Sequence, residues 1–257
     1  MAGRLEAEVV SLRSFGCASE LGLEVPTSFT AEPGQFVHVR CEGEGRILRR
    51  PYSLYAAGRG TAALLVRETG AGSAWLRRRE VGEKLDLLGP LGRGFTLPDE
   101  GKSFLVAGGA GIAPLHFLAN RMIENGMRPV VFWGVEADDE YGDLPCQLGE
   151  EMELHLACMD GSGDHEGSVV GMFEELNGGG IGGVYACGPR GMLAALAAVV
   201  GEEGLADLQV SMEERMACGV GACRGCVVPA VEPSGGYLTA CKDGPVFFGR
   251  ELDWRRI

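Results

Sequence analysis

Three cysteines crowd the segment MACGVGACRGC, residues 216–226. Their spacing is Cys218-x4-Cys223-x2-Cys226, and Cys241 follows after fourteen further residues. Three thiolates in one loop with a fourth beyond it are typical of a [2Fe–2S] cluster of the plant ferredoxin type. The spacing therefore predicts that these four cysteines hold an iron–sulfur cluster.

Glycines between the cysteines support this interpretation. The loop must curl so that backbone N–H groups face sulfur, and we expect Gly219, Gly221 and Gly225 to supply the positive φ angles that such a curl needs. A structural zinc site is the alternative, although zinc is usually bound by two separated C-x2-C pairs. The four histidines, which show no ligand spacing, are expected to be structural: His38, His116, His155 and His165.

Two segments of the N-terminal part indicate a flavin. Residues 49–55, RRPYSLY, are expected to end one strand and begin another, and they place a cation, an aromatic ring and a hydroxyl close together. An ordinary barrel strand could show the same residues. In ETGAGSAWL, residues 68–76, Gly70 and Gly72 precede a helix start with Ser73 near its cap. Helix N-termini preceded by glycine bind phosphate, so together the segments favour FAD.

Two strand-to-helix turns indicate a nicotinamide site. LVAGGAGIAPL, residues 105–115, contains Gly109, Gly111 and Pro114 in a G-x-G-x-x-P pattern that departs from the usual dinucleotide fingerprint. Proline is tolerated in a first helical turn. YACGPRGML, residues 185–193, places Cys187, Gly188 and Pro189 at another strand end. Each could be a plain turn, but ligands bind at the carboxyl ends of parallel strands, so their joint occurrence favours NAD binding.

The elements that must position these residues change in type along the chain. Residues 1–98 show alternating apolar residues with turn signals, which predicts an antiparallel β-barrel. Residues 99–210 alternate buried strands with helices, which predicts a parallel α/β sheet. Residues 211–257 have little periodicity, and the segment is too short to bury a sufficient hydrophobic core. We therefore expect a bound metal centre to stabilise its fold. We thus expect a multi-domain protein of 257 residues.

Composition narrows the function classes. The formal net charge of −13 argues against nucleic-acid and anionic-membrane surfaces. No signal peptide or membrane-spanning stretch is recognisable, so the expected location is the cytoplasm. The nine cysteines should therefore be thiols or metal ligands rather than disulfides.

The order of these motifs resembles the ferredoxin-reductase superfamily, and the segment SMEERMACGVGACRGCVV with the later ACKDGPVF resembles the electron-transfer subunits of NAD-dependent dihydroorotate dehydrogenase. The resemblance implies FAD, one [2Fe–2S] cluster and NAD as substrate. It implies a partner subunit that carries FMN and oxidises dihydroorotate in pyrimidine synthesis, in a complex of two copies of each subunit. Tyr52 stands where an aliphatic residue is common in this family. By position, these residues would contact the FAD: Arg50, Pro51, Tyr52, Ser53, Leu65, Val66, Arg67, Gly72 and Ser73.

The resemblance makes this chain an adaptor between two-electron and one-electron carriers, with no catalytic residue for orotate chemistry. Cys187 would help to position the nicotinamide. Acidic residues in EADDE, 136–140, and CMDGSGDHEG, 158–167, predict a preference for NAD over NADP. Alternatives are a related adaptor, such as a sulfide dehydrogenase or ferredoxin transhydrogenase subunit, and a zinc-stapled interaction protein. We also expect an exposed apolar docking patch around the cluster, formed by Met212, Met216, Val220, Val227, Val228, Val246, Phe247 and Phe248.

Overall fold

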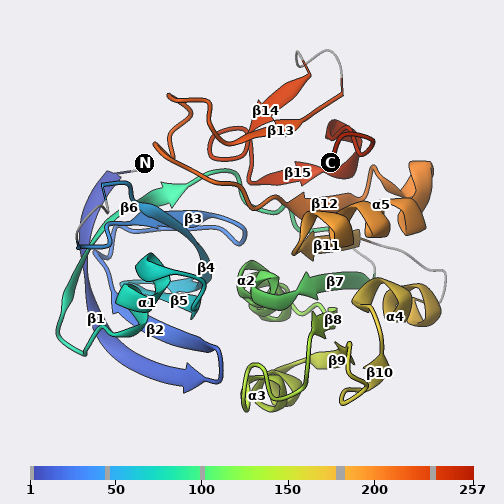
Figure 1. Cartoon of the computed structure of the whole chain (residues 1–257), viewed down its shortest axis with the longest axis horizontal. Coiled ribbons are helices and arrows are strands. Elements are labelled where there is room, and N and C mark those ends of the chain that lie inside the picture. The colour runs from blue at the N-terminus through green and yellow to red at the C-terminus, as the bar shows by residue number, and fades with distance from the viewer. Residues whose placement is uncertain (1–2, 44–46, 99–101, 178–182, 232–235) are drawn as a thin grey trace.

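The structure is a computed structural model that describes residues 3–43, 47–98, 102–177, 183–231 and 236–257. Figure 1 shows a β-barrel on the left, an α/β unit on the right and a cysteine-bearing segment above both. Across the described ranges, no helix is both long and apolar enough to cross a membrane.

Six antiparallel strands close the barrel in the order β1-β2-β5-β4-β3-β6, which confirms the predicted architecture. Side chains alternate between core and surface along β6, as expected of a strand with one buried face. The expectation that residues 49–55 join two strands is wrong, because one continuous strand, β4, begins at Arg50. The strands are β1 (Gly3–Phe15), β2 (Ala18–Glu24), β3 (Phe36–Val39), β4 (Arg50–Gly58), β5 (Thr61–Arg67) and β6 (Lys84–Leu91).

A seven-stranded sheet in the order β10-β9-β8-β7-β11-β12-β15 forms the α/β unit, and all its neighbouring strands are parallel except β12 and β15. The order reverses direction between β7 and β11, and open α/β sheets bind ligands at such a switch point. The strands are β7 (Ser103–Gly108), β8 (Val130–Val135), β9 (Glu153–Cys158), β10 (His165–Glu166), β11 (Gly183–Cys187), β12 (Leu208–Ser211) and β15 (Val246–Phe248).

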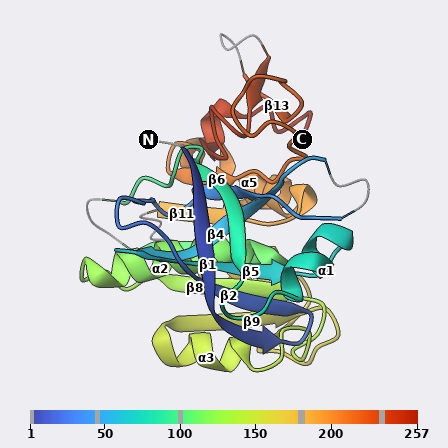
Figure 2. The same ribbon diagram turned by 90° about the vertical axis from the view of Figure 1, so that its left-hand side faces the viewer.

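Helices pack against this sheet, and one short helix lies beside the barrel (Figure 2). The helix α2 has a nearly continuous buried face, with Pro114 in its first turn as predicted. Sequence periodicity missed α3, which is short and has only two buried residues, Leu144 and Leu148. The helices are α1 (Ala71–Arg77), α2 (Ile112–Glu124), α3 (Leu144–Glu151), α4 (Val169–Leu176) and α5 (Arg190–Gly204), with 3-10 turns η1 (Gly109–Gly111) and η2 (Gly249–Glu251).

The C-terminal segment is built into the α/β unit rather than held by the cysteines alone. It forms a two-stranded sheet, β13 (Val227–Pro229) with β14 (Tyr237–Thr239), and then returns as β15 to pair antiparallel with β12. This pairing places Phe247 at 0% exposure. The predicted apolar docking patch is therefore wrong for four of its eight residues, because Met212, Val228, Val246 and Phe247 are buried. Val220 is 49% exposed, and Met216, Val227 and Phe248 are half-buried.

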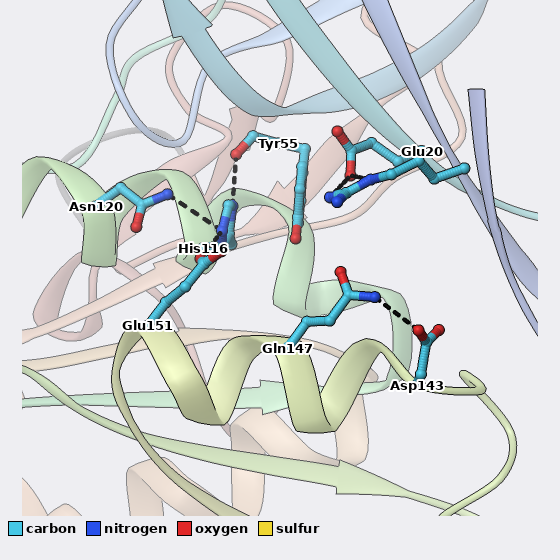
Figure 3. Close-up of polar contacts among 8 residues, drawn as sticks. Glu20, Tyr55, His116, Asn120, Asp143, Gln147 and Glu151 are labelled. Atoms are coloured by element: carbon cyan, nitrogen blue, oxygen red, sulfur yellow. Dashed lines mark hydrogen bonds and ion pairs between the residues drawn. The ribbon is translucent and has the colours of Figure 1, made fainter. Parts of the chain in front are cut away.

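A ring pair joins the barrel to the α/β unit (Figure 3). The ring of Tyr55, on β4, stacks on the ring of His116, on α2, with centroids 3.9 Å apart and an interplanar angle of 9°. The Nδ1 atom of His116 lies 3.0 Å from the Tyr55 carbonyl oxygen, and Asn120 and Glu151 approach Nε2 at 3.1 and 3.5 Å. Since a carbonyl only accepts, Nδ1 carries a proton. The contact fixes the predicted flavin strand relative to the helix that follows the G-x-G-x-x-P turn.

Candidate flavin, nicotinamide and iron–sulfur site

One pocket, of about 260 Å³, is bounded by all three parts of the molecule. The barrel contributes Pro51, Tyr52, Ser53, Leu65 and Arg67, all predicted flavin contacts. The other walls come from the α/β unit and the C-terminal segment: Ala110, Ala113, Ser211, Met212, Glu213, Glu214, Met216 and Pro245, with Phe36 and Thr69 of the barrel side completing the lining. Val66 was also a predicted flavin contact, but it does not line this pocket. Successive side chains of a strand point to opposite faces, so Val66, between Leu65 and Arg67, faces the barrel core and is 0% exposed.

A second pocket, of about 350 Å³, shares Pro51, Tyr52, Arg67 and Thr69 with the first and extends to the start of α1. Arg50 lies against Gly72, where an added Cβ would sit 3.3 Å from its Cγ. The Ser73 hydroxyl accepts the N–H groups of Thr69 and Gly70 at 2.8 and 3.0 Å and thereby orders the turn that begins the helix. A guanidinium beside a helix N-terminus is suited to a pyrophosphate, so these residues fit the FAD diphosphate.

The two predicted nicotinamide turns touch each other at the switch point of the sheet. A Cβ on Gly111 would lie 2.1 Å from the Cys187 carbonyl oxygen, and one on Gly108 would lie 2.8 Å from Pro189 Cδ. Glycine is therefore needed here for close packing between β7 and β11. The structure brings Gly109, Gly111, Cys187, Gly188 and Pro189 together, although Ala110 and Ala113, not these residues, line the pocket.

Two of the predicted nicotinamide residues are buried. Pro114, in the first turn of α2, is buried, and Cys187 is 0% exposed. Burial raises the pKa of the Cys187 thiol well above its usual value, with the nearby Glu213 carboxyl contributing. The thiol is therefore protonated at neutral pH, which agrees with a positioning role and not a nucleophilic one.

The cysteine loop points backbone N–H groups at sulfur, as a cluster requires. Cys218 Sγ accepts from the N–H groups of Val220 and Cys223 at 3.5 and 3.4 Å. The other acceptors are Cys241 Sγ from Gly221 at 3.1 Å, Cys223 Sγ from Gly225 at 3.4 Å, and Cys226 Sγ from Cys241 at 3.4 Å. Every predicted ligand sulfur accepts at least one such bond, so the loop is built to hold negative charge on sulfur.

The four cysteines also form two pairs. The side chains of Cys218 and Cys223 are hydrogen-bonded, as are those of Cys226 and Cys241, and Cys241 also interacts electrostatically with Cys218 of the other pair. In the described chain, no three His, Cys, Asp or Glu side chains gather around a point that a single metal ion could occupy. A two-iron cluster needs only two thiolates at each iron, so the paired arrangement fits [2Fe–2S].

Two of the four predicted ligand thiols differ in acidity. The N–H groups of Cys223 and Val220 lower the pKa of Cys218 to about 6, which favours the thiolate that binds metal. Burial raises the pKa of Cys241 to about 12, so this thiol needs the metal itself to release its proton. Of the predicted glycines, Gly219 and Gly221 have φ of +72° and +79°. The expectation of a positive φ at Gly225 is wrong, because Arg224 takes the left-handed position at +53°, although the Gly225 N–H does approach Cys223 Sγ at 3.4 Å.

Sequence reasoning missed two glutamates of the pocket. Burial raises the pKa of Glu213, yet its side chain retains exposed surface because it lines the pocket. Glu214 forms an ion pair with Arg190, at the start of α5. Both precede the cysteine loop in SMEERM, and their position beside a metal-binding motif was the only available signal.

The predicted acidic loops come together after β8 and β9. The Asp138 N–H donates to the Ser162 hydroxyl at 2.9 Å, and Ser162 donates to Asp160 at 2.6 Å. A shallow pocket beside them is lined in part by Asp138, Asp139 and Asp164. Within this lining there is no Lys or Arg, so the loops form an acidic edge on the α/β unit.

Comparisons with known proteins agree with this geometry. A family model described as the iron-sulfur cluster binding domain of dihydroorotate dehydrogenase B matches residues 213–253. Another, described as an oxidoreductase FAD-binding domain, matches residues 18–95. The first match favours the cluster over a structural zinc site, and the second covers the barrel strands that line both flavin-side pockets.

Solved structures share the architecture. The NADH-dependent reduced ferredoxin-NADP oxidoreductase, from a study of flavin-based electron bifurcation, aligns with a TM-score of 0.85 and 28% identity over 97% of this chain and 90% of that chain. Ferredoxin reductase in carbazole 1,9a-dioxygenase aligns with a TM-score of 0.66 and 23% identity over 77% and 65% of the two chains, a likeness of fold alone.

Curated relatives cover most of the chain. The dihydroorotate dehydrogenase B (NAD(+)) electron transfer subunit of Fusobacterium nucleatum is 36% identical over 233 residues, which is 86% of each chain. That of Geobacillus thermodenitrificans is 38% identical over 231 residues, again 86% of each. Together with the FAD-binding and iron–sulfur domains, these relatives show that the chain belongs to the family of electron-transfer subunits of dihydroorotate dehydrogenase B (NAD⁺).

Proposed function

We propose that this chain passes electrons between NAD(H) and a catalytic partner subunit that oxidises dihydroorotate with FMN. One observation carries the proposal: a single pocket is bounded by the barrel, by the turn after β7 and by the segment leading into the cysteine loop. A flavin placed there would lie beside both a nicotinamide site and a cluster. Flavins exchange two electrons with nicotinamide and single electrons with iron–sulfur clusters.

The residues of this chain would bind and orient the carriers. Arg50, Gly72 and Ser73 are suited to the FAD pyrophosphate, and Tyr52, Ser53 and Arg67 line the space for its ring. Arg67 is itself held by Glu140, 2.5 Å away, on the loop after β8. This ion pair would keep the guanidinium oriented between the flavin side and the nicotinamide side. Cys218, Cys223, Cys226 and Cys241 would hold the cluster.

The partner would dock near Cys218 and Cys223, the outer cysteine pair. Cys226 and Cys241 are each 2% exposed, whereas Cys223 is exposed and Cys218 is half-buried. Val220, between them in the chain, is also exposed. Electrons would therefore enter or leave the chain on the side of Cys218 and Cys223.

We also propose a complex of two copies of each subunit, as the family resemblance suggests. Within this chain, the flavin domain would comprise residues 1–98, the nicotinamide domain residues 99–210 and the cluster domain residues 211–257.

Reconstitution tests the proposal. Mixed with the FMN-containing catalytic subunit, the chain should confer dihydroorotate-dependent NAD⁺ reduction that neither protein shows alone. Equal NAD⁺ reduction by the isolated partner, or no association of the two at micromolar concentration, would refute the assignment. Iron and flavin analysis of the purified chain is the control, because it reports the cofactors without the partner.

A second function is favoured by one observation. The NADH-dependent reduced ferredoxin-NADP oxidoreductase matches 97% of this chain, with a TM-score of 0.85. A ferredoxin-linked transhydrogenase adaptor would use the same pocket and cluster but a different partner. Reduction of NADP⁺ that requires both NADH and reduced ferredoxin, in the presence of a second, NADP-binding subunit and without dihydroorotate, would support this alternative.

A further inference from the structure

A buried histidine lies between the flavin pocket and the cysteine loop. His38 is on β3 of the barrel and is 0% exposed. Within the described chain, neither of its ring nitrogens has a hydrogen-bond partner. Buried polar groups nearly always have a partner, so a histidine with none indicates a missing one.

The position of His38 limits what that partner can be. A Cβ added to Gly219 would lie 2.8 Å from both Cε1 and Nδ1 of the imidazole, and 3.1 Å from Nε2. The ring therefore lies directly against the backbone of the residue that follows Cys218. Gly219 also has φ of +72°. Any side chain at 219 would be excluded both by the backbone angle and by the imidazole.

The strand that carries His38 connects this contact to the flavin side. In the barrel, His38 pairs with Pro51, and Phe36 pairs with Ser53. The rings of Phe36 and His38 are 5.6 Å apart, and Phe36 lines the pocket. Val37 and Val39 face the barrel core instead. On the outward face of β3, the Phe36 ring therefore lies at the flavin pocket and the His38 ring lies at the cysteine loop.

We propose that His38 donates a hydrogen bond from its imidazole to a sulfur of the [2Fe–2S] cluster and so sets the cluster's affinity for electrons. The inference rests on the proposed cluster site. An imidazole has at least one N–H in either protonation state, and the cluster offers sulfur acceptors. Hydrogen bonds to sulfur are among the factors that set cluster reduction potentials. Because the reduced cluster carries more negative charge, a donor at this position favours reduction.

A spectroscopic test uses the unmodified sequence. The loaded chain is labelled with ¹⁵N-histidine, reduced with dithionite and measured by pulsed EPR. A weak ¹⁵N coupling to the cluster is expected, and it should disappear in His38→Gln, which keeps the labels at His116, His155 and His165. No histidine coupling in the wild-type protein would overturn the proposal.

Reduction potentials measured by EPR-monitored titration give a second test. His38→Leu should lower the cluster potential by about 59 mV, a tenfold change in the electron equilibrium of a one-electron couple. His38→Gln keeps an N–H donor and should recover part of the shift. Leu88→Val, at the position paired with His38 on β6, alters packing without removing a donor and should leave the potential unchanged.

The outcomes distinguish a failure of the proposed electron-transfer function from a failure of the proposed hydrogen bond between His38 and the cluster. Purified chain without iron would refute the proposed function itself. A cluster of normal iron content, with equal potentials in the wild type and both His38 variants, would refute only the role of His38. Equal shifts in His38→Leu, His38→Gln and Leu88→Val would assign the effect to packing and would also refute it.

Discussion

The cysteine loop and the paired turns after β7 and β11 are both rich in glycine, but the glycines are required for different reasons. In the loop, Gly219 and Gly221 adopt left-handed backbone angles. In the turns, Gly111 has an ordinary helical conformation, with φ of −61°, and is needed because the Cys187 carbonyl oxygen occupies the space of a side chain.

This difference determines what a sequence can reveal. The requirement in the loop is local: residues within a few positions of each other must curl around sulfur, so cysteine and glycine spacing reports it directly. The requirement in the turns arises between segments about 75 residues apart, and it follows only once β7 and β11 are known to be neighbours. Substitutions in the cysteine loop and in the paired turns should therefore cause different defects.

The largest effect is expected in the loop. Cys223→Ser removes one of two thiolates from the outer cysteine pair and should abolish cluster absorbance and the EPR signal of the reduced protein. FAD content and NADH oxidation by artificial dyes should persist, because the flavin-side pockets do not include Cys223. Cys146→Ser, at an exposed cysteine outside the loop, is the control. Tightly bound zinc and no iron in the anaerobically purified wild type would contradict the premise.

The paired turns predict a different defect. Gly111→Ala would place a Cβ 2.1 Å from the Cys187 carbonyl oxygen and should reduce stability by about 1–3 kcal/mol, as overpacking does. NADH oxidation should fall, while iron content is retained. Gly191→Ala, in α5, meets nothing within 4 Å and should be neutral or stabilising by up to about 1 kcal/mol. Chemical denaturation measures both, and equal effects would show that the close approach is not what requires glycine.

The same distinction explains which features the sequence predicts. The barrel follows from the alternation of apolar and polar residues, and the parallel sheet from the alternation of strands with helices. The cysteine ligands follow from their spacing in the sequence. The burial of Phe247 was not predictable from local pattern, because Phe247, on β15, pairs with Val210 on β12, 37 residues earlier (247 − 210). Glu213 was missed for a similar reason. Nothing in its own neighbourhood shows that Phe36 and Pro51, from the barrel, complete the pocket it lines.

His38 is the sharpest example of this limit. By sequence it is a single histidine in an apolar strand, for which a structural role is the reasonable expectation. Its lack of a hydrogen-bond partner and its contact with Gly219 appear only when the barrel and the cysteine loop are seen together. Local patterns therefore identify the ligands of a cofactor more readily than the residues that surround it.

Nucleotide preference should show an intermediate effect. The acidic edge formed by the loops after β8 and β9 would repel a 2′-phosphate, so kcat/KM should favour NADH over NADPH by at least about tenfold, or 1.4 kcal/mol. Replacing Asp138 and Asp160 by Ser should narrow this ratio. Glu203→Gln, on α5, removes a carboxylate elsewhere and should not. Comparable kcat/KM values for the two nucleotides in the wild type would refute the argument.

The smallest effect is expected at the contact between the barrel and the α/β unit. The hydrogen bond that the Glu151 carboxylate accepts from His116 lowers the pKa of Glu151, so folding favours the deprotonated carboxylate. Its contribution to stability is present above the ordinary glutamate pKa of about 4.3 and is lost as the pH falls through the lower folded value. Because the Glu151 side chain is 55% exposed, the contribution should be below about 1 kcal/mol. Glu151→Gln should therefore lower Tm slightly at pH 7 and by less at pH 3.5. The adjacent Glu150→Gln is the control, because it removes a carboxylate that is not among the contacts of His116. A Tm difference that is the same at both pH values would mean that Glu151 does not act through its charge, and that the stacked rings of Tyr55 and His116 hold this contact without it.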